Sequence, residues 1–250
     1  MASHRFSDER ISVSKFIFKG SFCPNCGNGL KIRHLFPVLS WIFFKGKCGF
    51  CFEKISIRYP LIEVGTAILF LVIFFSLGSV FSLKLFLILL MAVTLMIMTV
   101  VDLEYYFIPD FTQVFLGFLI VIYHLTIPSE YNFEYYYYSG VLLLVVGLGL
   151  HFGFLLLTKK QGIGEDDIKF LFFAGFMLGV HQILIFMILS GLFGIIFGPI
   201  WKFLKKDDTF PFAPALGLAF LVCLIFEIDY IEFFGMLLYW AQKYITQTAY

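Results

Sequence analysis

Long apolar stretches separated by short polar segments fill the chain from residue 61 onwards. A transmembrane helix needs about 20 mostly apolar residues, with a range of roughly 17 to 25. The pattern therefore predicts six spanning helices, at Leu61–Leu77, Leu85–Val101, Phe111–Ile127, Ser139–Thr158, His181–Trp201 and Phe212–Ile228. A seventh apolar run, Ile168–Leu178, is shorter and predicts a tilted or half-buried helix that lines a cavity.

Composition agrees with this pattern, because 60% of the 250 residues are hydrophobic and only 14% are charged. Such values exclude an ordinary soluble domain. The predicted fold class is all-α, a polytopic membrane helical bundle with a small cytoplasmic zinc-knuckle domain. We expect residues 1–59 to form this N-terminal region and residues 60–250 to form the membrane domain.

The charges are segregated along the chain and predict its topology. Residues 1–60 contain ten Lys and Arg against three acids, which places this region in the cytoplasm by the positive-inside rule. Threading the helices alternately from there puts Tyr135–Tyr138 in an outer aromatic belt. The tail 229–250 is predicted at the outer interface. Asp102 and Asp167 both fall at the cytoplasmic membrane face.

Four cysteines form two C-x-x-C pairs with 21 residues between them, Cys23, Cys26, Cys48 and Cys51. Cytosolic thiols stay reduced, so two such pairs indicate a four-thiolate zinc site rather than disulfides. Metal binding would also supply folding free energy to a region too short to build much core. The alternative is an unligated cytoplasmic loop. Cys223 lies alone in an apolar helix and is interpreted as a small core residue.

Two carboxylates are candidates for chemistry. Asp102 follows the apolar run Leu85–Val101. A carboxylate at the C-terminal end of a helix opposes the helix dipole, so a capping role does not suit it. Asp110, by contrast, is predicted to cap the helix that begins at Phe111. Glu63 is read as a stabilising charge near a helix start.

Three consecutive acids, Glu165, Asp166 and Asp167, stand between a Gly-x-Gly turn and the apolar run at Ile168. One acid there would act as a helix N-cap, but three adjacent acids repel each other. Repulsion and desolvation would keep one member of a carboxylate pair protonated near neutral pH, with Lys169 offsetting part of the remaining charge. His151 is interpreted as a packed polar group. The central prediction is that Asp102 and Asp167 meet across the bundle as a two-carboxylate site.

Five segments in this order resemble the type IV prepilin peptidases, the GxGD class of membrane aspartyl proteases: CPNC…GKCGFC, IRYPLIEV, VDLEYYFIPD, GIGEDDIK and FPFAPALGLA. The resemblance implies an endopeptidase of the bacterial inner membrane that removes the leader of prepilin-like proteins at the cytoplasmic face. Asp102 matches the first catalytic aspartate of the family and Asp167 the second.

The resemblance also implies partners and cofactors. Substrates would be prepilins or pseudopilins of pilus or type II secretion systems; lipid surrounds the helices, and no nucleic acid is expected. Many family members methylate the new N-terminus with S-adenosylmethionine, an activity associated with the cysteine region. Zinc would be structural. The oligomeric state is left open.

This sequence departs from the family pattern at two places. No apolar helix precedes the cysteine region, although family members normally begin with one, and this bears on methylation and on substrate docking. Asp166 also occupies the place where the family has a glycine, which leaves open whether Asp166 or Asp167 is the second catalytic acid.

Two other functional classes compete with a peptidase. A transporter or channel would use intramembrane carboxylates to bind a proton or cation, but its acids are expected near the bilayer midplane rather than at helix ends. A non-catalytic adaptor would use the cysteine module to bind pilus-assembly proteins.

Overall fold

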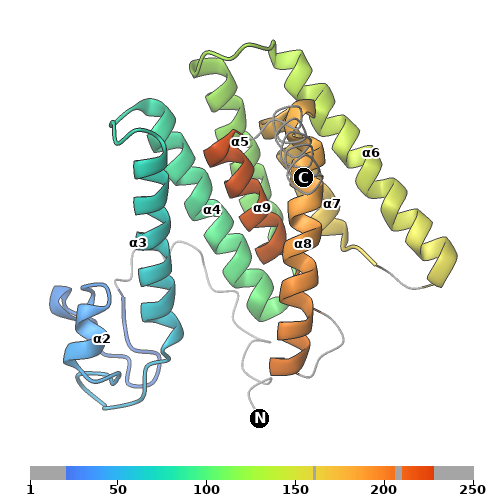
Figure 1. Ribbon diagram of the computed structural model, residues 1–250. Coiled ribbons are helices and arrows are strands. Elements are labelled where there is room, and N and C mark those ends of the chain that lie inside the picture. Colours follow the sequence, from blue (N-terminus) through green and yellow to red (C-terminus); the bar gives the residue numbers. More distant parts are fainter. Residues whose placement is uncertain (1–20, 160–161, 206–209, 228–250) are drawn as a thin grey trace, which may run out of the picture. The chain divides into compact units, whose positions relative to one another are not determined.

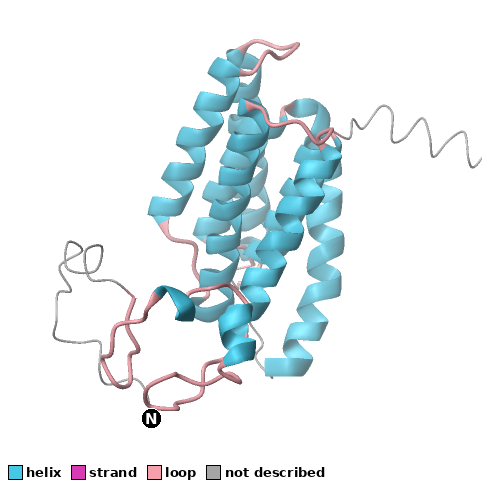
Figure 2. Ribbon diagram, turned by 90° about the vertical axis from the view of Figure 1, so that its left-hand side faces the viewer, coloured by secondary structure: helices cyan, strands magenta, loops and turns pink. Residues whose placement is uncertain are grey.

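A computed structural model describes residues 21–159, 162–205 and 210–227. Within these ranges the regular structure is helical, apart from two isolated β-bridges near the cysteines (Figure 2). The predicted all-α fold is therefore confirmed. The tail 229–250, predicted at the outer interface, lies outside the described residues.

The chain divides into two compact units, Met1–Ile68 and Leu69–Tyr250. Their boundary falls inside α3 (Arg58–Ser76), whereas the sequence pattern placed the division before that helix. In the first unit, the described part contains the 3-10 turn η1 (Ile32–His34) and the short helix α2 (Leu39–Phe43). Each unit is therefore considered by itself.

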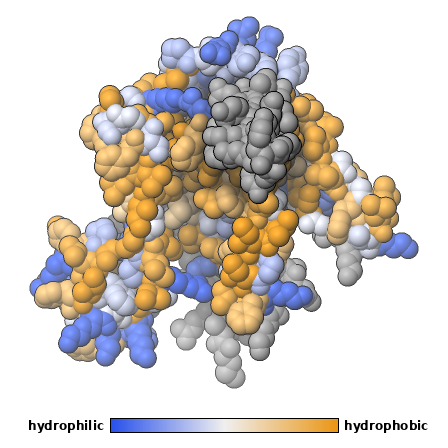
Figure 3. Space-filling model, viewed as in Figure 1, coloured by the Kyte–Doolittle hydropathy of each residue, from blue (hydrophilic) through white to orange (hydrophobic). Residues whose placement is uncertain are grey.

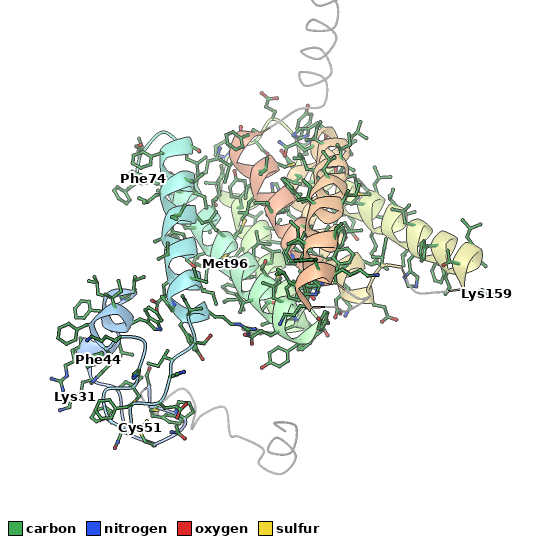
Figure 4. All side chains as sticks on the ribbon, turned by 60° about the horizontal axis from the view of Figure 1, so that its bottom comes forward. Lys31, Phe44, Cys51, Phe74, Met96 and Lys159 are labelled. Carbon is green, nitrogen blue, oxygen red and sulfur yellow. The ribbon has the colours of Figure 1, made fainter. Side chains whose placement is uncertain are left out.

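Short polar and aromatic contacts hold the first unit together. The Trp41 indole N–H donates a hydrogen bond to the Ile55 carbonyl (3.1 Å). The ring of His34 stacks on Phe44, with ring centroids 4.9 Å apart. Glu63 accepts a hydrogen bond from the backbone N–H of Val38 (2.7 Å), so it joins α3 to the start of α2 besides carrying a charge near the helix start. Figure 4 shows Phe44 and Cys51 within this unit.

Six further helices make up the second unit: α4 (Leu83–Tyr105), α5 (Asp110–Thr126), α6 (Phe133–Thr158), α7 (Glu165–Leu178), α8 (Val180–Lys205) and α9 (Ala213–Phe226). Four of the chain's described helices, α3, α4, α6 and α8, are long and apolar enough to cross a membrane. With 17 and 14 residues, α5 and α9 are apolar but shorter. The chain is a multi-pass membrane protein. On the face shown in Figure 3, hydrophobic residues cover the helices of this unit.

The short helix α9 is the central element of the bundle. It packs against α4, α7 and α8, and Figure 1 shows it running between α4 and α8. Ten of its 14 residues are buried, among them Leu216, Ala219 and Phe220. Because its sides are covered by other helices, α9 brings its N-terminal end into the interior at the level where α4 ends.

Helices α6 and α7 approach closely at two glycines. A Cβ added to Gly175 would lie 2.6 Å from the Ser139 carbonyl oxygen and 3.0 Å from the Gly140 Cα. A Cβ on Gly140 would lie 2.8 Å from the Phe172 carbonyl oxygen. Backbone atoms cannot move away as a flexible side chain can, so glycine is required at this crossing.

We expect Gly175→Ala to lower the free energy of unfolding by about 1 to 3 kcal/mol, because the methyl group overpacks the crossing. The matched control is Gly149→Ala in α6, where an added Cβ meets nothing within 4 Å. That control should leave stability unchanged or raise it by about 0.5 to 1 kcal/mol through helix propensity. Thermal unfolding of both variants in the same detergent measures the difference, and equal melting temperatures would contradict the close crossing.

Candidate active site and metal centre

Asp102 lies in the last turn of α4, and its side chain is buried, with 5% of its surface exposed. Its Oδ2 accepts a hydrogen bond from the backbone N–H of Ala213 (2.9 Å). The backbone carbonyl of Asp102 accepts the N–H of Tyr106, the left-handed residue that ends α4. The structure thus fixes both the backbone and the carboxylate of this residue.

The donor to Asp102 is a helix N-terminus. Ala213 is the first residue of α9, Phe212 is its N-cap, and Pro214 follows in the first turn. The first N–H groups of a helix have no partner within the helix and carry partial positive charge. Therefore α9 provides the favourable dipole that α4 cannot provide at its own C-terminal end. Sequence reasoning missed this backbone donor, and the signal that could have found it is Pro214, which marks a helix start.

Asp167 occupies the first turn of α7 and is half-buried. Its carboxylate folds back toward the helix start and accepts a hydrogen bond from the Gly164 backbone. A Cβ added to Gly164 would lie 3.1 Å from its Oδ2. The same carboxylate lies close enough to Asp102 for the two charges to repel each other. The structure therefore brings these two predicted residues together at one end of the bundle.

The other acids of the cluster have different surroundings. The helix begins at Glu165 with Gly164 as its N-cap, so all three acids lie inside the first turn and none is the N-cap residue. Lys169 pairs with the Asp166 carboxylate at 3.1 Å and with Asp110 at 2.7 Å. Asp166 thus has a cationic partner. Asp167, like Asp102, has a backbone N–H as its hydrogen-bond donor instead.

The expectation that Asp110 caps a helix beginning at Phe111 was wrong. Helix α5 begins at Asp110 itself, and its N-cap is Pro109, which has no side-chain group that could cap the helix. The Pro109 ring fixes the backbone before the helix, so the side chain of Asp110 is free to pair with Lys169. Its role is to connect α5 to α7 beside the acidic turn.

Gln113 is a buried polar residue at this site that the sequence did not single out. It is 2% exposed, and its Nε2 donates to the backbone carbonyl of Asp166 (3.1 Å). Its Oε1 is buried without a hydrogen-bond partner. The available signal was a side-chain amide inside an apolar helix. Burying such a group costs free energy unless it makes hydrogen bonds, so its presence suggests a role.

His151 has the packed role that was predicted for it. Its Nδ1 lies 2.9 Å from the carbonyl oxygen of Ile163, directly before the N-cap of α7. The contact connects α6 to the loop that precedes the acidic turn of α7. Cys223 is fully buried in α9, as expected for a core residue.

The four predicted metal-ligand cysteines meet in the first unit. Their Sγ atoms all lie within 4.8 Å of one another, and those of Cys23 and Cys51 are 3.9 Å apart. Thiolates about 2.3 Å from a tetrahedral zinc ion lie roughly 3.8 Å from each other. Backbone turns close each pair, with Gly27 donating to the Cys23 carbonyl and Phe52 to the Cys48 carbonyl. The cluster can hold a metal ion.

The thiol chemistry is consistent with cation binding. Backbone N–H groups of Cys51 and Phe50 lower the pKa of Cys48 to about 7. For Cys51, the backbone N–H of Glu53 acts in the same direction, but desolvation and the contacts with Cys26 and Cys48 raise its pKa to about 11. The Cys48 thiol therefore ionises easily, whereas ionisation of Cys51 is opposed by burial and by the neighbouring sulfur atoms. Ionising all four thiols requires a bound cation.

Two family models match separate parts of the chain. A family model described as the type IV leader peptidase family matches residues 86–199, and one described as the bacterial peptidase A24 N-terminal domain matches residues 3–77. No solved structure matches the chain.

Several curated relatives carry the name prepilin leader peptidase/N-methyltransferase. The protein from Bacillus subtilis (strain 168) is 31% identical over 222 residues, which cover 86% of this chain and 84% of that protein. The Aeromonas salmonicida (strain A449) protein is 32% identical, over 87% of this chain and 74% of its own length. The Neisseria gonorrhoeae protein is 30% identical, over 84% and 72%.

If the four clustered cysteines hold zinc, the purified protein should contain about one zinc ion per chain, the stoichiometry of a four-thiolate site. We expect Cys26→Ser to remove most of this metal and to expose the first unit to limited proteolysis. The matched control, Cys223→Ser, changes a cysteine outside the cluster and should retain the metal. Elemental analysis by mass spectrometry gives the stoichiometry, and equal zinc contents in both variants would reject the site.

Proposed function

The chain belongs to the type IV leader peptidase family, and we propose that Asp102 and Asp167 form the catalytic pair with which this membrane protease cleaves the leader of prepilin-like proteins. The observation that supports this most directly is the interaction between the two carboxylates at one end of the bundle. The substrates are prepilins or pseudopilins, the class in the name of the curated relatives.

Hydrolysis by two aspartates requires one ionised and one protonated carboxyl group. The ionised member takes a proton from a water molecule as the water attacks the scissile carbonyl carbon, and the protonated member donates to the carbonyl oxygen. Repulsion between neighbouring carboxylates keeps the pair in this singly protonated form. The pair therefore titrates as a unit, and neither acid has a pKa of its own.

The contacts favour an assignment of roles within the pair. Asp102 receives the backbone N–H of Ala213 at the start of α9, which stabilises a negative charge. Asp167 also accepts a backbone hydrogen bond, from Gly164, but desolvation and the charge of Asp102 favour its protonated form. We assign Asp102 as the ionised general base and Asp167 as the protonated acid of the resting state. Asp166 is not assigned a proton transfer in this scheme, because Lys169 pairs with its carboxylate, although its charge acts on both Asp102 and Asp167.

Gln113 is proposed as a positioning residue. Its donated hydrogen bond fixes the Asp166 carbonyl and therefore the backbone that carries Asp167. Its unpartnered Oε1 can accept a hydrogen bond from the nucleophilic water or from a backbone N–H of the substrate.

The two regions predicted from the sequence have separate tasks in this proposal. Residues 1–59 form the cytoplasmic metal-binding region, in which zinc on the four cysteines is structural. Residues 60–250 form the peptidase domain, built from the long helices α3, α4, α6 and α8 and the shorter helices α5, α7 and α9. The excess of basic residues in the first region supports a location on the cytoplasmic side of the bacterial inner membrane. The transporter and adaptor alternatives are not favoured, since the family is one of peptidases and the acids lie at helix ends.

Coexpression with a prepilin tests the catalytic pair. We expect Asp102→Asn and Asp167→Asn each to reduce leader cleavage by about 10²- to 10⁴-fold, the range for loss of a general acid or base. Asp166→Asn is the matched control on the adjacent residue and should leave cleavage within a few fold of wild type. Immunoblots of processed and unprocessed prepilin give the result, with enzyme levels compared in the same membranes. Normal processing by Asp102→Asn would reject the proposed chemistry.

Methylation by S-adenosylmethionine is a separate prediction, which rests on the family resemblance and on the N-methyltransferase in the relatives' name. Intact-mass analysis of the cleaved prepilin decides it, because an N-methyl group adds about 14 Da. We expect the methylated product from wild type and cleaved but unmethylated product from Cys26→Ser. An unmethylated product from wild type, with cleavage intact, would reject methylation and leave the peptidase proposal standing.

A further inference from the structure

A polar cavity of about 650 Å³ lies at the end of the bundle opposite to Asp102 and Asp167. Lys84 on its wall and Asp102 are 18 residues apart in α4, which corresponds to roughly 27 Å along the helix. This distance is close to the thickness of the hydrocarbon core of a bilayer, about 30 Å. The cavity therefore lies at the level of lipid head groups on the other side of the membrane.

Two hydrogen-bond acceptors behind the cavity wall have no partner. Gln182 is 5% exposed, and its Oε1 is buried and unpaired. The Nε2 of His124 lies 3.0 Å from the Phe176 carbonyl, which only accepts, so this nitrogen carries the proton. The Nδ1 of the neutral ring is then an acceptor, and it is also buried without a partner. Both atoms are acceptors that lack a hydrogen-bond donor.

The remaining wall supplies charge of both signs and aromatic faces. Lys84 and Glu227 form an ion pair at 2.7 Å, and both line the cavity with Glu130. The ring of Tyr136 stacks on His124, with centroids 4.1 Å apart, and Tyr131 lines the same space. Aromatic faces and carboxylates attract a cation, and Lys84 attracts an anion.

We propose that this cavity binds a phosphoethanolamine group, supplied by the head group of an aminophospholipid. The ammonium donates a hydrogen bond to Gln182 Oε1 and lies against the aromatic wall that includes Tyr136 and His124, and the phosphate lies beside Lys84. The terminal amide torsion of Gln182 is broad, so Oε1 turns toward the cavity at little cost. A volume of about 650 Å³ is within the usual range of roughly 300 to 1,000 Å³ for small-molecule sites.

The test is native mass spectrometry of the full-length protein in detergent, titrated with phosphatidylethanolamine or phosphatidylglycerol of the same acyl chains. We expect phosphatidylethanolamine to bind about tenfold more tightly, the effect of one good polar contact. Gln182→Leu should remove this preference while preserving the fold, because it replaces an unpaired buried amide with an apolar side chain. Gln182→Glu retains an acceptor and should retain the preference.

Two comparisons define the site further. Ser190→Ala changes another buried polar residue of α8 that does not line the cavity, and it should leave the lipid preference unchanged. Free phosphoethanolamine should compete for the site in the millimolar range, which separates the head group from the acyl chains as the recognised part. Asp102→Asn should bind lipid as wild type does. Equal binding of the two lipids by wild type, or an unchanged preference in Gln182→Leu, would overturn the proposal.

Discussion

The hydrogen bond from the Ala213 backbone to Asp102 is the interaction on which the rest of the site depends. A buried carboxylate in the last turn of a membrane helix is unfavourable twice, because it is desolvated and because it faces the negative end of the helix dipole. A second helix that begins at that point offsets both effects. The N-terminus of α9 lies against α4 and supplies a hydrogen bond and the positive end of a helix dipole. The position of α9 in the centre of the bundle is therefore a requirement of the site.

The same reasoning explains how three adjacent acids can share one helical turn. Glu165 is exposed to solvent, Asp166 pairs with Lys169, and Asp167 turns inward toward Gly164 and Asp102. Repulsion by the Asp102 and Asp166 carboxylates favours the protonated form of Asp167. Lys169 and Asp110 thus separate a structural acid from the one proposed to react. Exposed pairs of this kind contribute little stability, so their effect here is to give Asp166 and Asp110 a common cationic partner.

The sequence predicted the large features of this arrangement for physical reasons that can be stated. Hydrophobic length marked the helices, and alternate threading of them brought Asp102 and Asp167 to one end without any knowledge of contacts. Repeated C-x-x-C spacing marked the metal cluster, and the four sulfur atoms do come together. In each case the signal is residue type and spacing, and both can be read directly from the sequence.

The features that were not predicted from the sequence depend on backbone groups and on packing. The Ala213 donor is a peptide N–H, which has no side-chain signature, and the pairing of Asp110 with Lys169 depends on the register between α5 and α7. The division of the chain inside α3 follows from which residues touch, and hydropathy does not record that. Helix ends were misjudged where polar residues continue a helix, as at Asp102–Tyr105, because an apolar window stops before the hydrogen bonds do.

Each end of the bundle contains buried polar atoms without a partner in the described residues, and this has a functional meaning. At the end with the acids, Asp102 and His151 have protein partners, whereas Gln113 Oε1 and Trp201 Nε1 have none. Gln113 lies next to the proposed catalytic turn. At the other end, two unpaired acceptors stand beside a cavity. Unpaired buried acceptors destabilise a fold unless something outside the chain completes them. A membrane protein has water, substrate and lipid available for this purpose. Which of these completes a buried group depends on its depth in the bilayer. Substrate or water is available beside the reacting acids, and a lipid head group is available at the opposite membrane boundary.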